Sequence, residues 1–288
     1  MPGDLYDNAG NMVVNPHDTT TTDVYDAWNR MVAVKNSGTI IESYAYDGRH
    51  FRVAATSSGT TVHDYHNDSW QVIEQRVGSA SSARAQFVWS AAYVDALVQE
   101  QRDTDANGSL DRTLYATHDA NFNVTAAVTL GGIAQQRFLY DAYGARSVLT
   151  FDWQPTTSAP ILDHGHQGGR SDAATGFILF RHRYLSPGLM RWTTRDPAGY
   201  VDGTNLYQCA RSSGTNLVDP SGLDSAIWEF ISCMENCTKD NDPIDFALGE
   251  ALTALAGQQL PKSWVARLAR FVGDEQLARG IERSLSTP

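Results

Sequence analysis

A tyrosine-headed unit of about 20 residues recurs in the first half of the sequence and constrains the fold more than any other feature. Four copies begin at tyrosines that lie 19, 21 and 19 residues apart, and a fifth follows a less regular stretch. The heads are Tyr6-Asp7, Tyr25-Asp26, Tyr46-Asp47, the weaker Tyr65-His66-Asn67-Asp68, and Tyr140-Asp141. Repetition of this kind indicates structural units that bury their apolar faces by stacking on one another.

Each unit predicts a β-hairpin. A turn rich in Gly, Asn and Asp follows the Tyr-Asp pair, and then comes an alternating segment such as Met31–Val34 or Phe51–Ala54. The Asp carboxylate can accept hydrogen bonds from backbone N–H groups and so close the turn. The Tyr ring can pack against apolar neighbours, and its hydroxyl can reach the solvent-exposed edge. We therefore expect a mainly β fold in which residues 5–150 form a wound antiparallel sheet. An ordinary meander with coincident tyrosines is the alternative.

The sequence changes character after residue 150. A Pro/Thr/Ser loop precedes a predicted strand at Phe177–Tyr184, and a run with many turn residues extends from Arg195 to Leu223. Beyond Leu223 the apolar residues are spaced three and four apart, which predicts a small α-helical C-terminal segment. The expected helices are Ile227–Met234, Ile244–Ala256, Trp264–Val272 and Glu275–Leu285.

Residues 5–223 resemble the YD-repeat (RHS) family. The Tyr-Asp units at 5–150 resemble YD repeats, 138–223 resembles the RHS repeat-associated core domain, and 224–288 would be the variable C-terminal segment. Most of the specificity lies in fixed positions of the last run, which are Arg195-Asp196-Pro197, Gly199, Gly203, Asn205-Leu206-Tyr207, Asp219-Pro220 and Gly222-Leu223. The resemblance implies a β-strip wound into a hollow shell, as in Tc toxin C components, RHS toxins and teneurins.

The resemblance also implies an intramolecular cleavage that releases the C-terminal segment inside the shell. The scissile bond would be Leu223–Asp224, and an aspartic-protease arrangement would use Asp196 and Asp219, with Arg195 orienting or polarising. Two carboxylates held close together share a proton, so one can activate water while the other polarises a carbonyl. The alternative is architectural, because Asp-Pro pairs commonly begin turns.

Two positions depart from the family pattern. Cys209 stands where an aromatic residue is usual, and Gly214 stands where Pro is usual. Loss of a ring removes packing, and Gly costs more ordering entropy than Pro. The sequence therefore predicts that the motif is retained as architecture even if cleavage is impaired.

A second candidate site is an acidic loop that fits the start of a Ca²⁺-binding loop. The matching ligand positions are Asp103, Asp105, Asn107, Ser109 and Asp111, with Gly108 at the sixth position. Position twelve is Leu114 in place of a bidentate Glu. The loop predicts weak Ca²⁺ binding or, alternatively, an acidic hairpin tip; no other cofactor is expected.

Composition narrows the choice of partners. The chain has 22 Lys and Arg against 33 Asp and Glu, a net charge of −11, which argues against nucleic acid or an anionic membrane as the main partner. No stretch approaches 18 uninterrupted apolar residues, so no membrane span is expected. The first residues show no signal-peptide pattern, although the resemblance implies a secreted or cell-surface protein.

The expected partners are upstream RHS repeats and the chain's own C-terminal segment, which has no His and no assignable activity. An alternative function is a cell-surface module that binds a glycan or a protein without catalysis. Its aromatic contacts would come from the spaced tryptophans Trp28, Trp70, Trp89 and Trp153. No signature of a conventional turnover enzyme is present at useful spacing.

Overall fold

The computed structural model describes residues 5–16, 18–91, 93–200 and 203–223. The chain divides into two units, Met1–Ala226 and Ile227–Pro288, and every described residue belongs to the first. The four predicted C-terminal helices and Asp224 lie outside the described residues. Among the described residues, no helix has the length and apolar character needed to cross a membrane.

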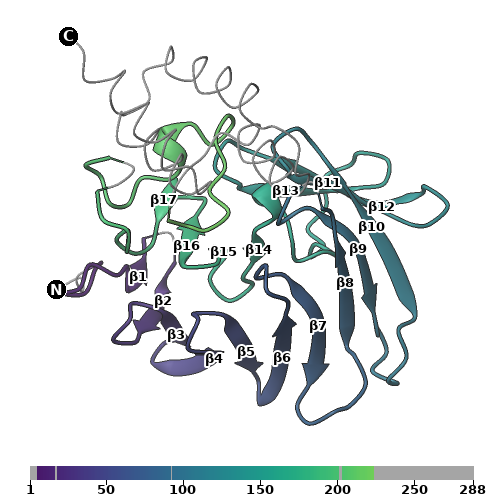
Figure 1. The fold of residues 1–288 in the computed structure, drawn as a ribbon, viewed down its shortest axis with the longest axis horizontal. Coiled ribbons are helices and arrows are strands. Elements are labelled where there is room, and N and C mark those ends of the chain that lie inside the picture. The colour runs from purple at the N-terminus through teal and green to yellow at the C-terminus, as the bar shows by residue number, and fades with distance from the viewer. Residues whose placement is uncertain (1–4, 17, 92, 201–202, 224–288) are drawn as a thin grey trace, which may run out of the picture. The chain divides into compact units, whose positions relative to one another are not determined.

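A 13-stranded antiparallel sheet accounts for most of the fold, and its strands are hydrogen-bonded in sequence order (Figure 1). Every connection therefore joins neighbouring strands, as stacked hairpins require. The strands are β1 (Val14–Asn15), β2 (Asp18–Tyr25), β3 (Met31–Asn36), β4 (Thr39–Tyr46), β5 (Arg52–Ser57), β6 (Thr60–His66), β7 (Val72–Val77), β8 (Ala85–Trp89), β9 (Leu97–Arg102), β10 (Arg112–His118), β11 (Val124–Val128), β12 (Ala134–Tyr140) and β13 (Arg146–Thr150).

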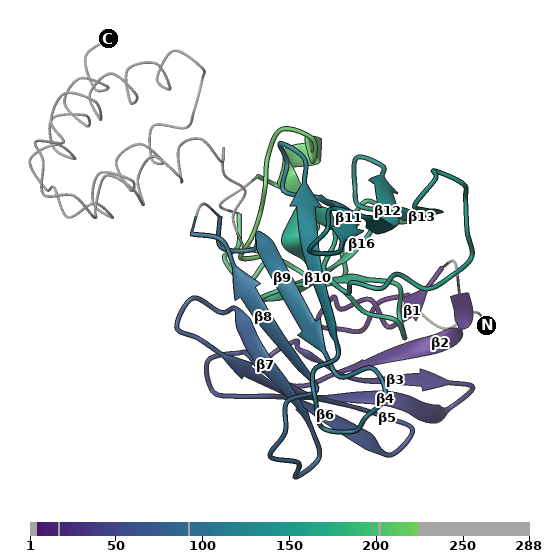
Figure 2. The ribbon, with the colours of Figure 1, turned by 90° about the vertical axis from the view of Figure 1, so that its right-hand side faces the viewer.

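A second, four-stranded sheet lies on the concave side of the first (Figures 1 and 2). Its strands are β14 (Arg170–Ser171), β15 (Ile178–Phe180), β16 (Arg183–Ser186) and β17 (Arg191–Trp192), with the short 3₁₀ turns η1 (His166–Gly168) and η2 (Ala210–Ser212). The prediction of one strand over Phe177–Tyr184 was wrong. Phe180 pairs with Arg183, so Arg181 and His182 form a tight turn between two strands.

The Tyr-Asp turns have the predicted structure. Asp26 accepts the backbone N–H of Trp28 at 2.9 Å and of Arg30 at 3.0 Å, so one carboxylate oxygen closes the turn on both sides. The same two acceptor contacts, to the second and fourth residues onward, recur at Asp47, Asn67, Asp119 and Asp141. The third residue onward has a positive φ, at Asn29, His50, Trp70, Phe122 and Gly144.

Two of these units do not begin with tyrosine. Asn67 is the turn acceptor in the fourth unit, so the head of that unit is His66, and Tyr65 is 45% exposed. A further unit begins at His118-Asp119, in the stretch where the sequence had no tyrosine at the expected spacing. A search for an Asp or Asn five residues before each strand would have found both.

Three aromatic side chains at the start of units bind their unit to the one before it. The Tyr46 hydroxyl donates to the Met31 carbonyl at 2.8 Å, and the Tyr140 hydroxyl donates to the Val124 carbonyl at 2.9 Å. Trp89 makes the equivalent bond to a carbonyl of β7 through its indole N–H. The two tyrosine hydroxyls thus bond to backbone carbonyls instead of reaching the solvent-exposed edge, and they tie successive hairpins together.

Three buried Arg–Asp pairs join the two sheets. They are Arg52–Asp172 at 2.9 Å, Arg170–Asp64 at 2.8 Å and Arg181–Asp95 at 2.8 Å. In each pair one partner lies in or beside the large sheet and the other in or beside the small one. Removing one member of a buried ion pair costs about 3–5 kcal/mol, because the other charge stays buried and uncompensated. These pairs therefore hold the small sheet in one position on the concave face.

Gly144 is required where a Tyr-Asp turn touches the loop that contains His166. Its φ is +88°, and a Cβ there would lie 2.6 Å from the His166 ring. We expect Gly144→Ala to combine a left-handed backbone cost of about 1–2 kcal/mol with an overpacking cost of about 1–3 kcal/mol. Gly59→Ala is the control, because Gly59 has φ +77° and open space around it. If urea unfolding shows that the two variants lose the same free energy of unfolding, this packing is contradicted.

Asp23 is a buried acid on β2, 6% exposed. Burial, and then the charge of Asp172, raise its pKa to about 7 from an ordinary value of 3.8. The unfolded chain therefore loses this proton near pH 4 and the folded chain near pH 7, so Asp23 lowers the free energy of unfolding as the pH rises through this window. Asp23→Asn should be more stable than the wild type at pH 8 and should show a flatter decline. If the free energies of unfolding of the wild type and Asp23→Asn change in parallel from pH 4.5 to 8.5, the burial of a protonated Asp23 is contradicted.

Candidate functional site

The last described residues form a tight turn, Asp219–Leu223. The Gly222 N–H donates to the Asp219 carbonyl at 3.3 Å, and the Asp219 carboxylate accepts the Leu223 N–H and the Ser221 hydroxyl, both at 3.1 Å. Gly222 has φ +70°, and a Cβ there would lie 3.2 Å from the backbone nitrogen of Arg183. The turn therefore needs glycine for its backbone conformation and for its close approach to β16.

The structure brings Asp196 and Asp219 to one guanidinium, that of Arg183. The Arg183 Nη2 atom lies 2.9 Å from Asp196 Oδ2 and 3.5 Å from Asp219 Oδ2. The three side chains are 1%, 5% and 3% exposed, respectively. Arg183 also lies 4.4 Å from the centre of the Trp192 ring. A buried cation between two carboxylates favours their charged forms, in contrast to the shared proton of an isolated pair.

Arg195, the third candidate residue, lies elsewhere. It is exposed, and its guanidinium packs over the first Tyr-Asp turn, where a Cβ on Gly10 would lie 2.3 Å from Arg195 Nε. Tyr207 closes the same contact, because its hydroxyl donates to the Gly10 carbonyl at 2.7 Å. Arg195 thus anchors the start of the described chain to the terminal region, and Arg183 contacts the carboxylates.

Sequence reasoning missed the residues that hold the terminal turn. Arg181, His182 and Arg183 bind three successive carbonyls, those of Pro220, Ser221 and Gly222. Arg181 uses Nη1, Arg183 uses Nε, and His182 uses both its backbone N–H at 3.1 Å and its ring Nδ1 at 3.0 Å. The signal in the sequence was a run of three basic residues directly after the apolar residues Phe177–Phe180. Basic side chains so close to an apolar strand are buried only when they have polar partners.

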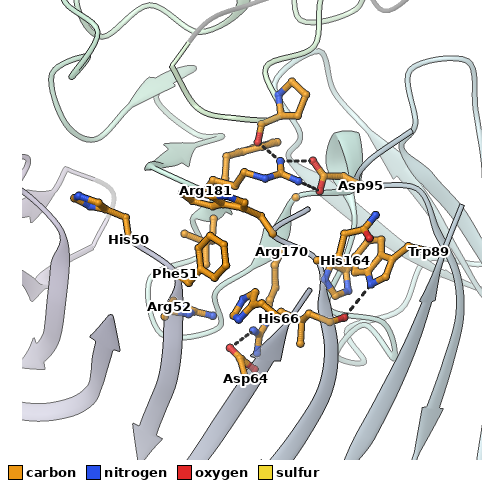
Figure 3. A pocket seen from close by; sticks show the side chains of 18 residues that line it. His50, Phe51, Arg52, Asp64, His66, Trp89, Asp95, His164, Arg170 and Arg181 are labelled. Carbon is orange, nitrogen blue, oxygen red and sulfur yellow. Dashed lines mark hydrogen bonds and ion pairs between the residues drawn. The ribbon is translucent and has the colours of Figure 1, made fainter. Parts of the chain in front are cut away.

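Each member of the triplet has a second partner. Both Arg181 amino groups bind the Asp95 carboxylate at 2.8 Å (Figure 3). The His182 ring lies 4.7 Å from the Trp70 ring, at the positive-φ position of a repeat turn. Burial lowers the pKa of His182, so the neutral ring donates from Nδ1 to the Ser221 carbonyl. The terminal turn is thereby connected to the large sheet.

The two positions that depart from the family pattern are both held by tertiary contacts. Cys209 is 6% exposed and packs with Ile178, Leu185 and Trp192 in the core of the small sheet. A Cβ on Gly214 would lie 2.4 Å from the Ala142 carbonyl. The Gly214 carbonyl accepts side-chain amides of Asn121 at 2.8 Å and Gln167 at 2.9 Å. These contacts restrain the segment that lacks the proline.

The acidic loop lies between β9 and β10. Carboxylate oxygens of Asp103, Asp105 and Asp111 lie within 4.8 Å of one another. The same carboxylates accept nearby backbone N–H groups, as when Asp103 accepts that of Gly108 at 2.8 Å and Asp111 accepts that of Thr104 at 2.7 Å. This is also how an acidic hairpin tip is stabilised, and weak Ca²⁺ binding stays a prediction.

Millimolar CaCl₂ is expected to raise the melting temperature of the wild type, because an ion that binds the folded state stabilises it by mass action. Asp105→Asn should lose this response, and MgCl₂ should give less of it, because Mg²⁺ dehydrates reluctantly. A melting temperature that does not change with Ca²⁺ would remove the site.

The four tryptophans that the sequence analysis grouped have different environments. Trp70 and Trp89 line a pocket between the two sheets, together with Phe51, His66 and His164 (Figure 3). Trp28 and Trp153 are 67% and 56% exposed at turns of the large sheet. They therefore do not form a continuous aromatic surface for a ligand.

Comparison with known proteins points to one group. No family model matches the sequence. The chain is 36% identical over 95 residues to the toxin subunit YenC1 of Yersinia entomophaga, which covers 32% of this chain and 9% of YenC1. It is 42% identical over 60 residues to the toxin subunit YenC2 of the same organism, covering 21% of this chain and 6% of YenC2. This chain thus matches less than a tenth of either relative.

The fold agrees with this similarity. The structure of the Photorhabdus luminescens Tc holotoxin pore, with a mutated TccC3, matches 78% of this chain and 11% of the solved chain, with a TM-score of 0.59 and 18% identity. At that identity the match shows the fold alone. This chain is a protein related to the RHS, or YD-repeat, family.

Proposed function

We propose that this chain is the C-terminal part of a YD-repeat shell and that its one reaction is a single-turnover hydrolysis of the Leu223–Asp224 bond. The observation that carries the proposal is the meeting of Asp196 and Asp219 at Arg183, while Asp219 also accepts the Leu223 N–H at 3.1 Å. A structural turn needs one capping carboxylate. The second buried carboxylate at the same guanidinium is what a reaction would use.

The proposed chemistry is hydrolysis. One carboxylate takes a proton from water, the oxygen of that water adds to the Leu223 carbonyl carbon, and the C–N bond to Asp224 breaks. The proton passes to the leaving nitrogen, so the first products are a carboxylic acid at Leu223 and a free amine at Asp224. The proton of the acid then passes to the amine, which leaves a carboxylate and an ammonium group. Both carboxylates contact the same guanidinium, so the proposed base is the pair and not one named residue. Arg183 would stabilise the negative charge that develops beside it.

The open sheet supports the proposed shell role. The large sheet has β1 at one edge and β13 at the other, and in the described part of the chain these two strands do not pair with each other. Open edges pair with other strands or aggregate unless they are covered. We propose that upstream repeats continue the sheet beyond β1 and that the enclosed partner is the segment after Leu223.

Intact-mass analysis of the purified full chain tests the reaction. The expected result for the wild type is a fragment that ends at Leu223. Asp196→Asn and Asp219→Asn should each reduce cleavage by at least about 100-fold, because amides cannot accept the proton from water. Asp64→Asn is the matched control, since it removes another buried Asp–Arg pair and should leave cleavage intact.

Uncut wild-type chain, with a stable fold, would favour the architectural interpretation and end the proposal. Cleavage that persists in both Asn variants would show that other groups perform it. If cleavage is lost in all three variants, the loss comes from impaired folding and not from the removal of the two catalytic carboxylates.

A further inference from the structure

We infer that the basic triplet Arg181–His182–Arg183 is a positioning clamp that makes cleavage after Leu223 depend on the folded large sheet. This inference rests on the proposed function and concerns the regulation of the same site. It assigns no catalytic role to Arg181 or His182, which act on the turn that precedes the scissile bond.

The clamp holds the backbone in register. Three consecutive side chains bind three consecutive carbonyls, so the path of Pro220–Gly222 is determined residue by residue. Leu223 follows directly, and its N–H is bound by Asp219 at 3.1 Å. Arg181 and His182 are the two residues of the turn between β15 and β16, so the pairing of these strands fixes where the clamp begins and ends. The bond after Leu223 therefore starts from a backbone with little freedom to move away from Arg183.

The clamp is connected to the large sheet mainly through Arg181. Its guanidinium makes two parallel bonds of 2.8 Å to Asp95, and the same guanidinium binds the Pro220 carbonyl (Figure 3). Asp95 lies in the loop between β8 and β9, 86 positions before Arg181. The pair is largely buried, with side chains 13% and 14% exposed. A bidentate pair of this kind sets the direction of the guanidinium as well as its place.

Regulation follows from this connection. Until β8 and β9 have paired, Asp95 is not in place, Arg181 has no partner for its buried charge, and the Pro220 carbonyl loses its donor. Displacement of a reacting group by about 1 Å can cost about 100-fold in rate. Cleavage would therefore wait until this part of the sheet has formed, and the C-terminal segment would not be released beforehand.

The test compares Asp95→Asn with Asp64→Asn in the full chain. Both variants remove the carboxylate of a buried Arg pair between the sheets, but the partner of Asp64, Arg170, does not contact the terminal turn. Each chain is made by cell-free translation and sampled over time, and cleavage is followed by intact mass. We expect Asp95→Asn to be cleaved at least about 10-fold more slowly than Asp64→Asn at a similar melting temperature. Asp95→Glu should recover part of the rate, because it restores the charge.

The outcomes separate the two proposals. If the wild type is cleaved and Asp95→Asn behaves as Asp64→Asn does, the clamp inference is overturned and the proposed function stands. If Asp95→Asn is cleaved slowly and Asp95→Glu is cleaved just as slowly despite a native melting temperature, the Asp95 charge does not position the clamp, and the inference is again overturned. If the wild type stays uncut, the proposed function fails and the clamp has no reaction to position.

Discussion

The buried Arg–Asp pairs between the two sheets are the constraint on which the rest of the structure depends. Hydrophobic contact alone would let the small sheet slide on the concave face, because apolar packing has no direction. Arg52–Asp172, Arg170–Asp64 and Arg181–Asp95 set one relative position, since each guanidinium must meet its carboxylate in the fork geometry. The cost of leaving any of these charges unpaired makes other arrangements unfavourable.

The repeat turns place those charges. Each of these turns is closed by one carboxylate or amide oxygen, so the spacing between strands is repeated from unit to unit. At Tyr46 and Tyr140 the aromatic head also binds the preceding hairpin. This regularity presents Asp64 from β6 and Asp95 from the β8–β9 loop toward the small sheet. The terminal turn, held by Arg181–Arg183, then lies against a surface that the repeats have already shaped.

Sequence patterns predicted the mainly β fold and the hairpins because both depend on local chemistry. The acceptor role of Asp26 and Asp47 needs only the next four residues, and the alternation at Met31–Val34 needs only its own strand. The head at His66 was missed because the search followed tyrosine and not the acceptor. The single strand predicted at Phe177–Tyr184 was wrong, because nothing local marks Arg181-His182 as a turn; distant partners hold both side chains.

By itself the sequence determined the hairpin unit, its turn chemistry, the acidic loop and the two carboxylates that merit attention, since each is written in neighbouring residues. Only the tertiary structure decided which cation Asp196 and Asp219 would meet. Arg195, adjacent to Asp196 in the chain, packs over Gly10, while Arg183 reaches both carboxylates. The physical reason is that a charge finds its partner through space: the pairing of β15 with β16 turns Arg183 inward, and no pattern along the chain reports that direction.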